Sequence, residues 1–202
     1  ILNIGGVANA TLIVGLTDLE IKSQDLGPGN CMIDEWIRKK SNLRYDKNGE
    51  NAKAGVVSEI LVSQALENHS YKFDKKSYSF DVKDFEINFA RGLDFRDGAA
   101  TITNFTSKLL ASKLSEFLKK ITTKKIKVLL CGGGRKNLTL VETIKKYCSK
   151  NININLIDEF SIDGDYIESQ AFAYLAIRTF LKLPISFPET TGCNKPLSGG
   201  NI

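Results

Sequence analysis

The sequence predicts an α/β fold, in which a β-sheet is layered against helices. In the second half of the chain, apolar runs typical of buried strands alternate with segments that carry apolar residues at helical spacing. The first part contains three short apolar or alternating runs separated by turn residues, a pattern typical of strands joined by hairpins. Several of these runs end in glycine-rich turns, which mark the sheet edge where α/β proteins bind ligands.

The first half of the chain supplies strands and then helices. Three short strands are expected over residues 1–4, 10–16 and 20–24. Apolar residues at helical spacing then predict helices over residues 31–40 and 56–68, joined by a polar, turn-rich connection. Residues 71–95 carry several aromatic side chains without a clear period, so no element is predicted there.

The second half of the chain has the clearer pattern. A long helix is predicted over residues 99–120, and IKVLLC at 126–131 is a nearly continuous apolar run, typical of a strand buried on both faces. A helix, a strand and a last helix are expected over residues 138–149, 152–158 and 165–183. Four aromatic residues on the predicted helices are expected in the core: Trp36, Phe172, Tyr174 and Phe180.

Composition argues against several classes of protein. The chain has 202 residues, of which 42% are hydrophobic, and no stretch approaches the roughly 18 continuous apolar residues of a membrane span. The net charge of +5 comes from lysines scattered along amphipathic segments, which argues against a nucleic-acid partner. The four cysteines form no CxxC pair, and the single histidine, His69, has no partner at metal-ligand spacing. We therefore expect a reduced, cytoplasmic protein without metal ligands of its own.

Three glycine clusters are the strongest candidate ligand sites: NIGG at residues 3–6, DLGPGN at 25–30 and CGGGRKN at 131–137. Glycine lets a phosphate approach backbone N–H groups, and a following helix N-terminus adds a favourable dipole. One cluster alone is more often a tight strand-to-helix turn, but three at strand ends favour a ligand site. None has the GxxxxGK[ST] or GxGxxG spacing, which argues against a Walker P-loop and a standard dinucleotide fold.

Asp25 stands at the mouth of the second glycine cluster, at the end of an extended run. Asn30 is better placed to cap the helix that follows, so Asp25 is the candidate for a chemical role. Its carboxylate could hold Mg²⁺ through the ion's water shell, or take a proton from an attacking oxygen. Both roles require the carboxylate to lie close to phosphate.

These clusters, together with DGAATITNFT at residues 97–106 and ESQAFAYLAIRTFLKLPISFPETTG at 168–192, resemble the anhydro-N-acetylmuramic acid kinases. That family belongs to the sugar kinase, heat-shock ATPase and actin superfamily. The resemblance covers nearly the whole chain, with the blocks in the family's order. It implies a ribonuclease-H-like (actin/sugar kinase) lobe with a mixed sheet flanked by helices.

The resemblance also implies a reaction. Family members use ATP and Mg²⁺ to open the 1,6-anhydro bond of 1,6-anhydro-N-acetylmuramic acid with water and to phosphorylate the freed O6, giving N-acetylmuramic acid 6-phosphate during cell-wall recycling. Asp25 matches the family's catalytic aspartate, the base that activates water against the anomeric carbon. A positioned carboxylate suits this role because water is a poor nucleophile at neutral pH.

Further site residues follow from the same resemblance. Contacts with the nucleotide and its phosphates are expected from glycines of all three clusters and one asparagine: Gly5, Gly6, Gly27, Gly132, Gly133, Gly134 and Asn137. Asn30 and Glu168 are expected to contact the sugar, and no residue is expected to bind a metal directly. Four of the charged residues have a simpler alternative. Glu168 can complement a helix N-terminus, Asp97 can cap a helix, and Arg135 and Lys136 are expected in solvent.

One family motif is missing. The first strand of these kinases carries a phosphate loop of the form GTSxDG, which this sequence lacks, as it lacks an initiator Met. We therefore expect residues 1–202 to be the C-terminal portion of a two-lobe kinase, mainly one α/β lobe, without the N-terminal phosphate-loop lobe, and inactive alone. A homodimer stays open. So do two other functions, another sugar or acetate kinase of the superfamily and a non-catalytic, actin-like ATP-binding module.

Overall fold

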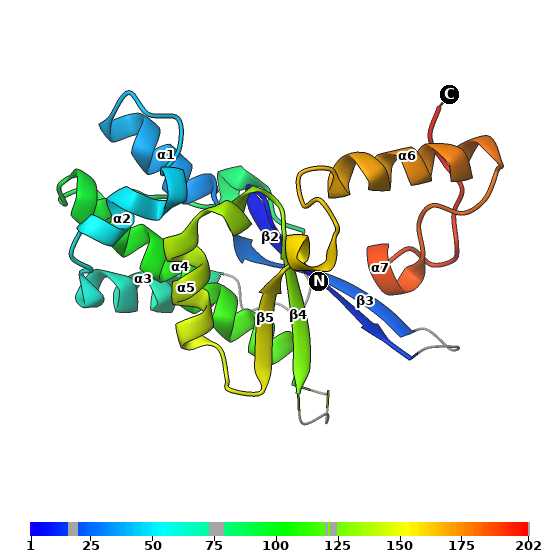
Figure 1. Ribbon diagram of the computed structural model, residues 1–202, viewed down its shortest axis with the longest axis horizontal. Helices are drawn as coiled ribbons and strands as arrows, with labels where there is room; N and C mark the ends of the chain where they lie inside the picture. Colours follow the sequence, from blue (N-terminus) through cyan, green and yellow to red (C-terminus); the bar gives the residue numbers. More distant parts are fainter. Residues whose placement is uncertain (16–19, 73–78, 120, 122–124, 202) are drawn as a thin grey trace.

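The fold is built on a single five-stranded sheet. The computed structural model describes residues 1–15, 20–72, 79–119, 121 and 125–201. The strands are β1 (Leu2–Ile4), β2 (Val7–Val14), β3 (Glu20–Pro28), β4 (Ile126–Cys131) and β5 (Ile152–Leu156). Their order across the sheet is β3-β2-β1-β4-β5, as Figure 1 shows in part. The expected α/β fold with a mixed sheet is confirmed.

The directions of the strands determine which strand ends lie at the same edge of the sheet. The first three strands pair antiparallel, as the predicted hairpins require, whereas β1 pairs parallel with β4 and β4 with β5. It follows that β1, β3, β4 and β5 all run the same way. Since the three glycine clusters lie at the carboxyl ends of β1, β3 and β4, they come to the same edge of the sheet, the edge at which α/β folds bind ligands.

Seven helices accompany the sheet in the described part of the chain. They are α1 (Cys31–Lys40), α2 (Glu50–Ala54), α3 (Glu59–Lys72), α4 (Phe95–Phe117), α5 (Leu138–Tyr147), α6 (Ile167–Phe180) and α7 (Pro188–Thr191). The bounds of α1 agree with the sequence prediction, and the other predicted helices are found with shifted ends. The predicted strand over residues 152–158 ends at Leu156, where a 3₁₀ turn (Ile157–Phe160) follows.

The N-terminus of α4 differs from the prediction, and the cap of the helix explains the difference. The helix begins four residues before the predicted start because Asp94 accepts a hydrogen bond from the Asp97 N–H (3.0 Å) and so caps it. Asp97 itself is not the cap. Its carboxylate accepts from the backbone N–H of Val56 (2.7 Å), which fastens the connection after α2 to the first turn of α4.

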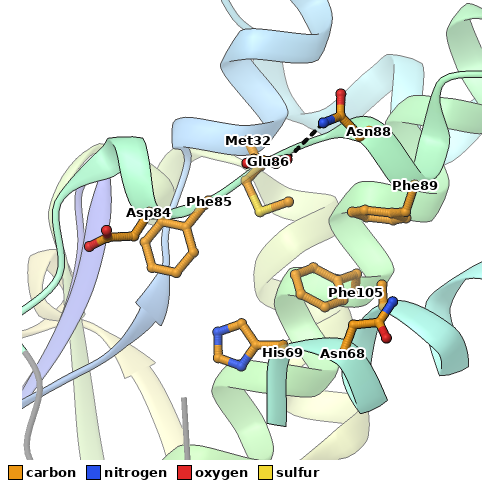
Figure 2. Close-up of a pocket in the computed structure, with 10 residues that line it drawn as sticks. Met32, Asn68, His69, Asp84, Phe85, Glu86, Asn88, Phe89 and Phe105 are labelled. Carbon is orange, nitrogen blue, oxygen red and sulfur yellow. Dashed lines mark hydrogen bonds between the residues drawn. The ribbon is translucent and has the colours of Figure 1, made fainter. Parts of the chain in front are cut away.

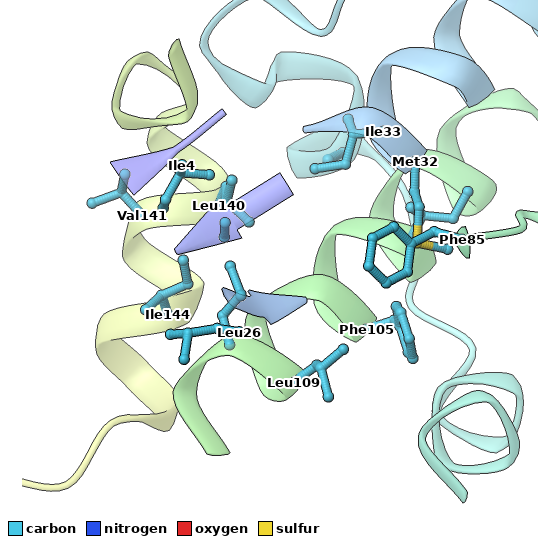
Figure 3. Packing of buried hydrophobic residues seen from close by; sticks show 14 of the residues in the cluster. Ile4, Leu26, Met32, Ile33, Phe85, Phe105, Leu109, Leu140, Val141 and Ile144 are labelled. Carbon is cyan, nitrogen blue, oxygen red and sulfur yellow. The ribbon is translucent and has the colours of Figure 1, made fainter. Parts of the chain in front are cut away.

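The core lies between the sheet and α1 to α5, with α4 packed against β3 and against its neighbouring helices. Figure 3 shows Ile4 and Leu26 from the strands gathered with Leu109 of α4 and with Leu140 and Ile144 of α5. Trp36 is buried, as predicted, with its indole N–H donating to Phe95 O (2.8 Å). Its ring lies against Gly98, where an added Cβ would overlap it.

The last helix departs from the prediction. Phe172, Tyr174 and Phe180 were expected in the core, but they are 66%, 58% and 73% exposed, and none of the described α6 side chains is buried. Figure 1 shows α6 and α7, in orange and red, on the opposite side of the strands from α1 to α5. The pattern predicted a helix that needs an apolar cover, and the described residues do not provide that cover.

Candidate functional site

The first two glycine clusters form one backbone unit. The N–H of Gly29 donates to Gly6 O (2.9 Å), and the N–H of Asn30 donates to Gly5 O (2.7 Å). An added Cβ at Gly29 would overlap Gly5 O, so the close approach requires glycine there. The turn after β1 and the start of α1 are thus fixed to each other, and these two amides are already used inside the protein.

The third cluster packs against the first. Gly132 has a φ of +78°, and an added Cβ would overlap Asn3 Oδ1, while one at Gly134 would overlap the side chain of Ile4. Gly133 differs, because the nearest atom to its added Cβ is Asn30 Nδ2 at 3.7 Å. The three clusters therefore meet at the carboxyl edge of the sheet, and Gly133 is the glycine of the third cluster at which an added Cβ would overlap no neighbouring atom.

A cavity of about 580 Å³ opens at this meeting point, and we call it the charged cavity. It is lined by Asn30, Asp34, Arg38, Arg44, Tyr45, Asp46, Lys47, Asn48, Gly133, Lys136 and Asn137. Three residues predicted from the sequence, Asn30, Gly133 and Asn137, therefore share one cavity. Four lining side chains are cationic and two are acidic, so the cavity favours an anionic ligand.

Two of the lining residues also hold the local fold. The Asn137 side chain accepts a hydrogen bond from Leu140 N–H (3.0 Å) and caps α5. Asp46 is buried, and its carboxylate accepts from the backbone N–H groups of Asn51 and Ala52 (both 2.9 Å). The Asp46 and Asn137 oxygens are thus already used as acceptors inside the protein. We therefore expect ligand contacts to come from the other polar side chains of the cavity.

Asp34 is the lining residue with the most altered acidity. Burial raises the pKa of its carboxyl group to about 6, with Arg38 opposing the rise and Asp46 adding to it. Asp34 therefore carries a full negative charge only above that pH. This acid was not singled out in the sequence, because nothing in a helix-spaced Asp indicates its burial beside a second carboxylate.

Asp25 lines a different cavity, of about 630 Å³, which we call the Asp25 cavity. Its other lining residues are Asn9, Thr11, Ser23, Gln24, Ser79 and residues 188–192. Between β2 and β3 the register shifts, so that Ala8 faces Gly27 and Asn9 faces Asp25. The extra residue, Leu26, enters the core, and half-buried Asp25 is left at the cavity, where its carboxylate accepts from Phe80 N–H (2.9 Å).

The remaining predicted site residues lie outside both cavities. Gly27 is buried in β3, where an added Cβ would lie 3.2 Å from the Leu109 side chain of α4. Glu168 is exposed in the first turn of α6, where it can complement the helix dipole. Gly5 and Gly6 form the turn between β1 and β2. Gly132 and Gly134, which pack against the first cluster, also line neither cavity, so the roles predicted for these six residues stay predictions.

Arg135 corrects a sequence-based expectation. It was expected in solvent but is only 4% exposed. Its Nε and Nη2 atoms donate to the two carboxylate oxygens of Asp158 (2.8 and 3.0 Å), and its Nη1 donates to Asp165 (3.0 Å) and to Gly132 O (3.1 Å). This forked geometry is the one that arginine forms with carboxylates. The interaction lowers the pKa of Asp158 to about 2.

Two neighbours complete the arginine cluster. Gly164 lies directly against the guanidinium, and an added Cβ there would overlap Arg135 Nε. Lys136, exposed as expected, pairs with the other oxygen of Asp165 (2.6 Å). Arg135 thus ties the third glycine cluster to the turn after β5 and to the approach of α6. No sequence pattern connects Arg135 with Asp158 and Asp165, which lie 23 and 30 positions further along the chain.

A smaller cavity of about 230 Å³ lies where the segment without a predicted element meets α1, α3 and α4 (Figure 2). The rings of Phe85, Phe89 and Phe105 border it together with Met32 and His69. The segment has a structural link to Asp25. Phe80 donates its backbone N–H to the Asp25 carboxylate, and its ring packs on that of Phe85 with 5.3 Å between the ring centroids. The ring of Phe85 thus packs on the residue whose backbone N–H holds the Asp25 carboxylate.

Neither of two further site types is found in the part of the chain that the structure describes. Those residues contain no group of three or more His, Cys, Asp and Glu side chains placed to hold a metal ion. The same residues contain no helix that is both long and apolar enough to cross a bilayer.

Asp34→Asn is expected to stabilise the protein at neutral pH. Between about pH 4 and pH 6 the folded protein binds a proton at Asp34 that the unfolded chain does not, so stability falls as the pH rises through this window and stays lower above it. Removing the charge should recover about 1 kcal/mol after allowance for solvent screening, or about 2–4 °C in Tm.

Thermal unfolding at pH 7.5 and at pH 4 measures this effect. The gain should be present at pH 7.5 and absent at pH 4, where Asp34 is already neutral in the folded protein. Glu142→Gln, which removes an exposed carboxylate of α5, is the control. An equal gain in the control, or no gain for Asp34→Asn at pH 7.5, would contradict the assignment.

Comparison with known proteins agrees with this arrangement. The family model described as anhydro-N-acetylmuramic acid kinase matches residues 1–202. The anhydro-N-acetylmuramic acid kinase of Pelagibacter ubique is 46% identical over 200 residues, which are 99% of this chain and 53% of that protein. The one from Zymomonas mobilis is 39% identical over 202 residues, which are 100% of this chain and 53% of that protein. The chain thus spans about half the length of these curated relatives, and it belongs to the anhydro-N-acetylmuramic acid kinase family.

Proposed function

We propose that the chain is part of an ATP- and Mg²⁺-dependent kinase that opens the 1,6-anhydro bond of 1,6-anhydro-N-acetylmuramic acid and phosphorylates O6, in the recycling of cell-wall sugars. The product is N-acetylmuramic acid 6-phosphate. The observation that carries the proposal, beside family membership, is that Asp25 lines one cavity while Asn30 and Gly133 line another, with Asp25 and Asn30 only five positions apart.

The domain arrangement is part of the proposal. The 202 residues form mainly one α/β lobe around a single sheet, the C-terminal portion of a two-lobe enzyme whose phosphate loop comes from the other lobe. The difference in length supports this, since the two relatives are almost twice as long as the matched region. An ATP-dependent enzyme of this kind works in the cytoplasm. Its possible assembly as a homodimer is tested by light scattering.

The Asp25 cavity is proposed to hold the sugar. Its walls carry hydroxyl and amide groups from Asn9, Thr11, Ser23 and Gln24, which match the hydroxyl and acetamido groups of an amino sugar. Thr11 Oγ1 and Ser23 Oγ lie 3.0 Å apart and so hold each other in place. The cavity volume of about 630 Å³ is in the range of small-molecule sites.

Asp25 is proposed as the base. Its carboxylate takes a proton from a water molecule while the water oxygen bonds to the anomeric carbon and the bond from that carbon to O6 breaks. The electron pair left on O6 then attacks the γ-phosphorus, and the bond to the bridging oxygen of ADP breaks. The hydrogen bond from Phe80 N–H to one carboxylate oxygen fixes the orientation of the base and leaves the other oxygen for the proton.

The charged cavity is proposed to hold ATP. It is lined by Arg38, Arg44, Lys47 and Lys136, whose charges suit an anionic nucleotide, and by Gly133, whose missing side chain leaves room for a flat ligand. Because the Gly29 and Asn30 amides are bonded to the first cluster, contacts at this corner come from the Asn30 side chain. This proposal differs from the sugar contact expected of Asn30, since Asn30 lines the charged cavity and not the Asp25 cavity. ATP supplies the phosphoryl group, and Mg²⁺ binds mostly through phosphate oxygens and water.

A coupled ADP-release assay on the longest form of the protein that the gene encodes tests the function. ADP should form with 1,6-anhydro-N-acetylmuramic acid and Mg²⁺ but not with N-acetylglucosamine, and in H₂¹⁸O the label should enter at C1 of the product. ADP formation with another sugar or with acetate would instead support a different kinase of the superfamily. Nucleotide binding without turnover on any acceptor would support a non-catalytic ATP-binding module.

A further inference from the structure

The carboxylate of Asp25 is held by a segment that lies outside the sheet. Asp25 lies on β3, and its carboxylate accepts a hydrogen bond from the backbone N–H of Phe80, which is 55 positions further along the chain (2.9 Å). Because this donor belongs to the backbone, its direction is not set by the side chain of Phe80. It depends instead on the contacts that hold the backbone around Phe80.

A second carboxylate holds the next peptide unit. The N–H of Asp81 donates to Asp84 Oδ2 (2.8 Å), and Asp81 Oδ1 accepts from the N–H of Lys83 (3.0 Å). Together the two aspartates form a reciprocal capping box around the 3₁₀ turn Val82–Asp84. The successive N–H groups of residues 80 and 81 therefore both donate to carboxylates, the first to Asp25 and the second to Asp84.

The turn is itself packed on two sides. A Cβ added at Gly6 would lie 3.1 Å from Val82 Cγ1, so the turn lies close to the first glycine cluster. Buried Phe85, which follows the turn, packs on the ring of Phe80 (5.3 Å between centroids) and stacks on the ring of His69 (6.2 Å). The capping box thus joins the backbone at Phe80 to a turn that is anchored on the rest of the protein.

We propose that Asp84 is a positioning residue for the reaction, because its carboxylate fixes the peptide unit after Phe80 and so directs the Phe80 N–H at Asp25. Figure 2 shows the Asp84 carboxylate directed away from the rings of Phe85 and Phe105, which agrees with its role as an acceptor for the backbone. A general base works only in the correct orientation to the proton that it takes. The inference rests on the proposed role of Asp25 as the base, and it holds whichever sugar the enzyme uses.

Amide hydrogen exchange tests the positioning directly, in the longest form of the protein that the gene encodes. Exchange at Phe80 should be at least about 10-fold faster in Asp84→Ala than in the unsubstituted protein, because the N–H then leaves its acceptor more often. Asp84→Asn should exchange at the unsubstituted rate, since its amide oxygen can still accept from the Asp81 N–H. Glu86→Ala is the matched control, because the Glu86 carboxylate bonds to the Asn88 side chain instead.

Two results would overturn the proposal. One is an unchanged exchange rate at Phe80 in Asp84→Ala, and the other is equally fast exchange in Glu86→Ala, since loss of any carboxylate in the segment would then suffice. Asp84→Leu, which keeps a branched side chain but has no acceptor, decides the case if Asp84→Ala fails to fold. The same fast exchange is expected for it, and an unchanged rate would again contradict the proposal.

Steady-state kinetics of the same variants measure the consequence for the reaction. Asp84→Ala should lower kcat and kcat/KM for the sugar equally, by about 10-fold, because an interaction that orients the base acts in the transition state. Asp84→Asn should restore both values. A rise in KM with unchanged kcat would overturn the positioning role, because Asp84 would then only shape the site that binds the sugar.

A double variant separates this inference from the proposed function. In Asp25→Asn, which lacks the base, the further change Asp84→Ala should not lower the residual turnover, because the two residues act through one interaction. An additional loss as large as that caused by Asp84→Ala alone would overturn the positioning role while leaving Asp25 as the base. Normal turnover in Asp25→Asn alone would overturn the proposed role of Asp25, and the inference with it.

Discussion

Asp25→Asn is expected to lower turnover by about 10²–10⁴-fold, the usual contribution of a general base, while the affinity for ATP stays unchanged. The amide can still accept the hydrogen bond from Phe80 N–H that orients the carboxylate, so the fold of the site is preserved. It cannot take a proton from water. Nucleotide affinity should not change because Asp25 and the charged cavity are separate.

The measurement combines ADP release at saturating ATP with calorimetric titration of ATP, on the longest form of the protein that the gene encodes. Glu116→Gln is the matched control, because it removes an exposed carboxylate of α4 that lines neither cavity. Turnover close to normal in Asp25→Asn would remove Asp25 from the chemistry. Loss of ATP affinity along with turnover would mean that Asp25 belongs to the nucleotide site.

Much of the fold was predictable from short-range patterns. The IKVLLC run is apolar on both sides of the strand, and β4 lies inside the sheet, between β1 and β5. Short runs separated by turn residues gave the antiparallel β1-β2-β3 part. These patterns depend on neighbours within about ten residues, so they can be interpreted without knowledge of the tertiary structure.

The site was predictable in location but not in the division of roles. Glycines at strand ends indicated the carboxyl edge of the sheet, and the three clusters do meet there. The sequence could not show that Gly29, Gly132 and Gly134 are needed for close packing of one turn on another, whereas Gly133 faces a cavity. That distinction depends on contacts between residues that are distant in the sequence, 24 positions apart for Gly29 with Gly5 and 130 for Gly134 with Ile4.

The two wrong expectations have related causes. Arg135 was expected in solvent because a charged residue in a loop usually is, but its carboxylate partners lie 23 and 30 positions further along the chain. The aromatic residues of α6 were expected in the core because the helix is apolar, and the described chain does not cover them. In each case local chemistry was interpreted correctly, and the distant partner that decides burial was missing.

Arg135→Ala is expected to lower the free energy of unfolding by about 3 kcal/mol and to weaken ATP binding. The substitution leaves a cavity, removes the fork to Asp158 and leaves Gly132 O without its side-chain donor. The third glycine cluster then loses its attachment to the turn after β5. Arg135→Lys should recover only part of both effects, since an ammonium group cannot form the fork.

Urea unfolding and ATP titration on the same preparations measure the two effects, with Lys113→Ala, which breaks an exposed ion pair of α4, as the control. Because the pKa of Asp158 is lowered to about 2, the fork contributes to stability above the unfolded carboxyl pKa near 4 and is lost as the pH falls through about 2. Arg135→Ala should therefore flatten the acid limb of the stability profile. If the variant lost stability but kept normal ATP affinity, Arg135 would hold the start of α6 without positioning the glycine loop for the nucleotide.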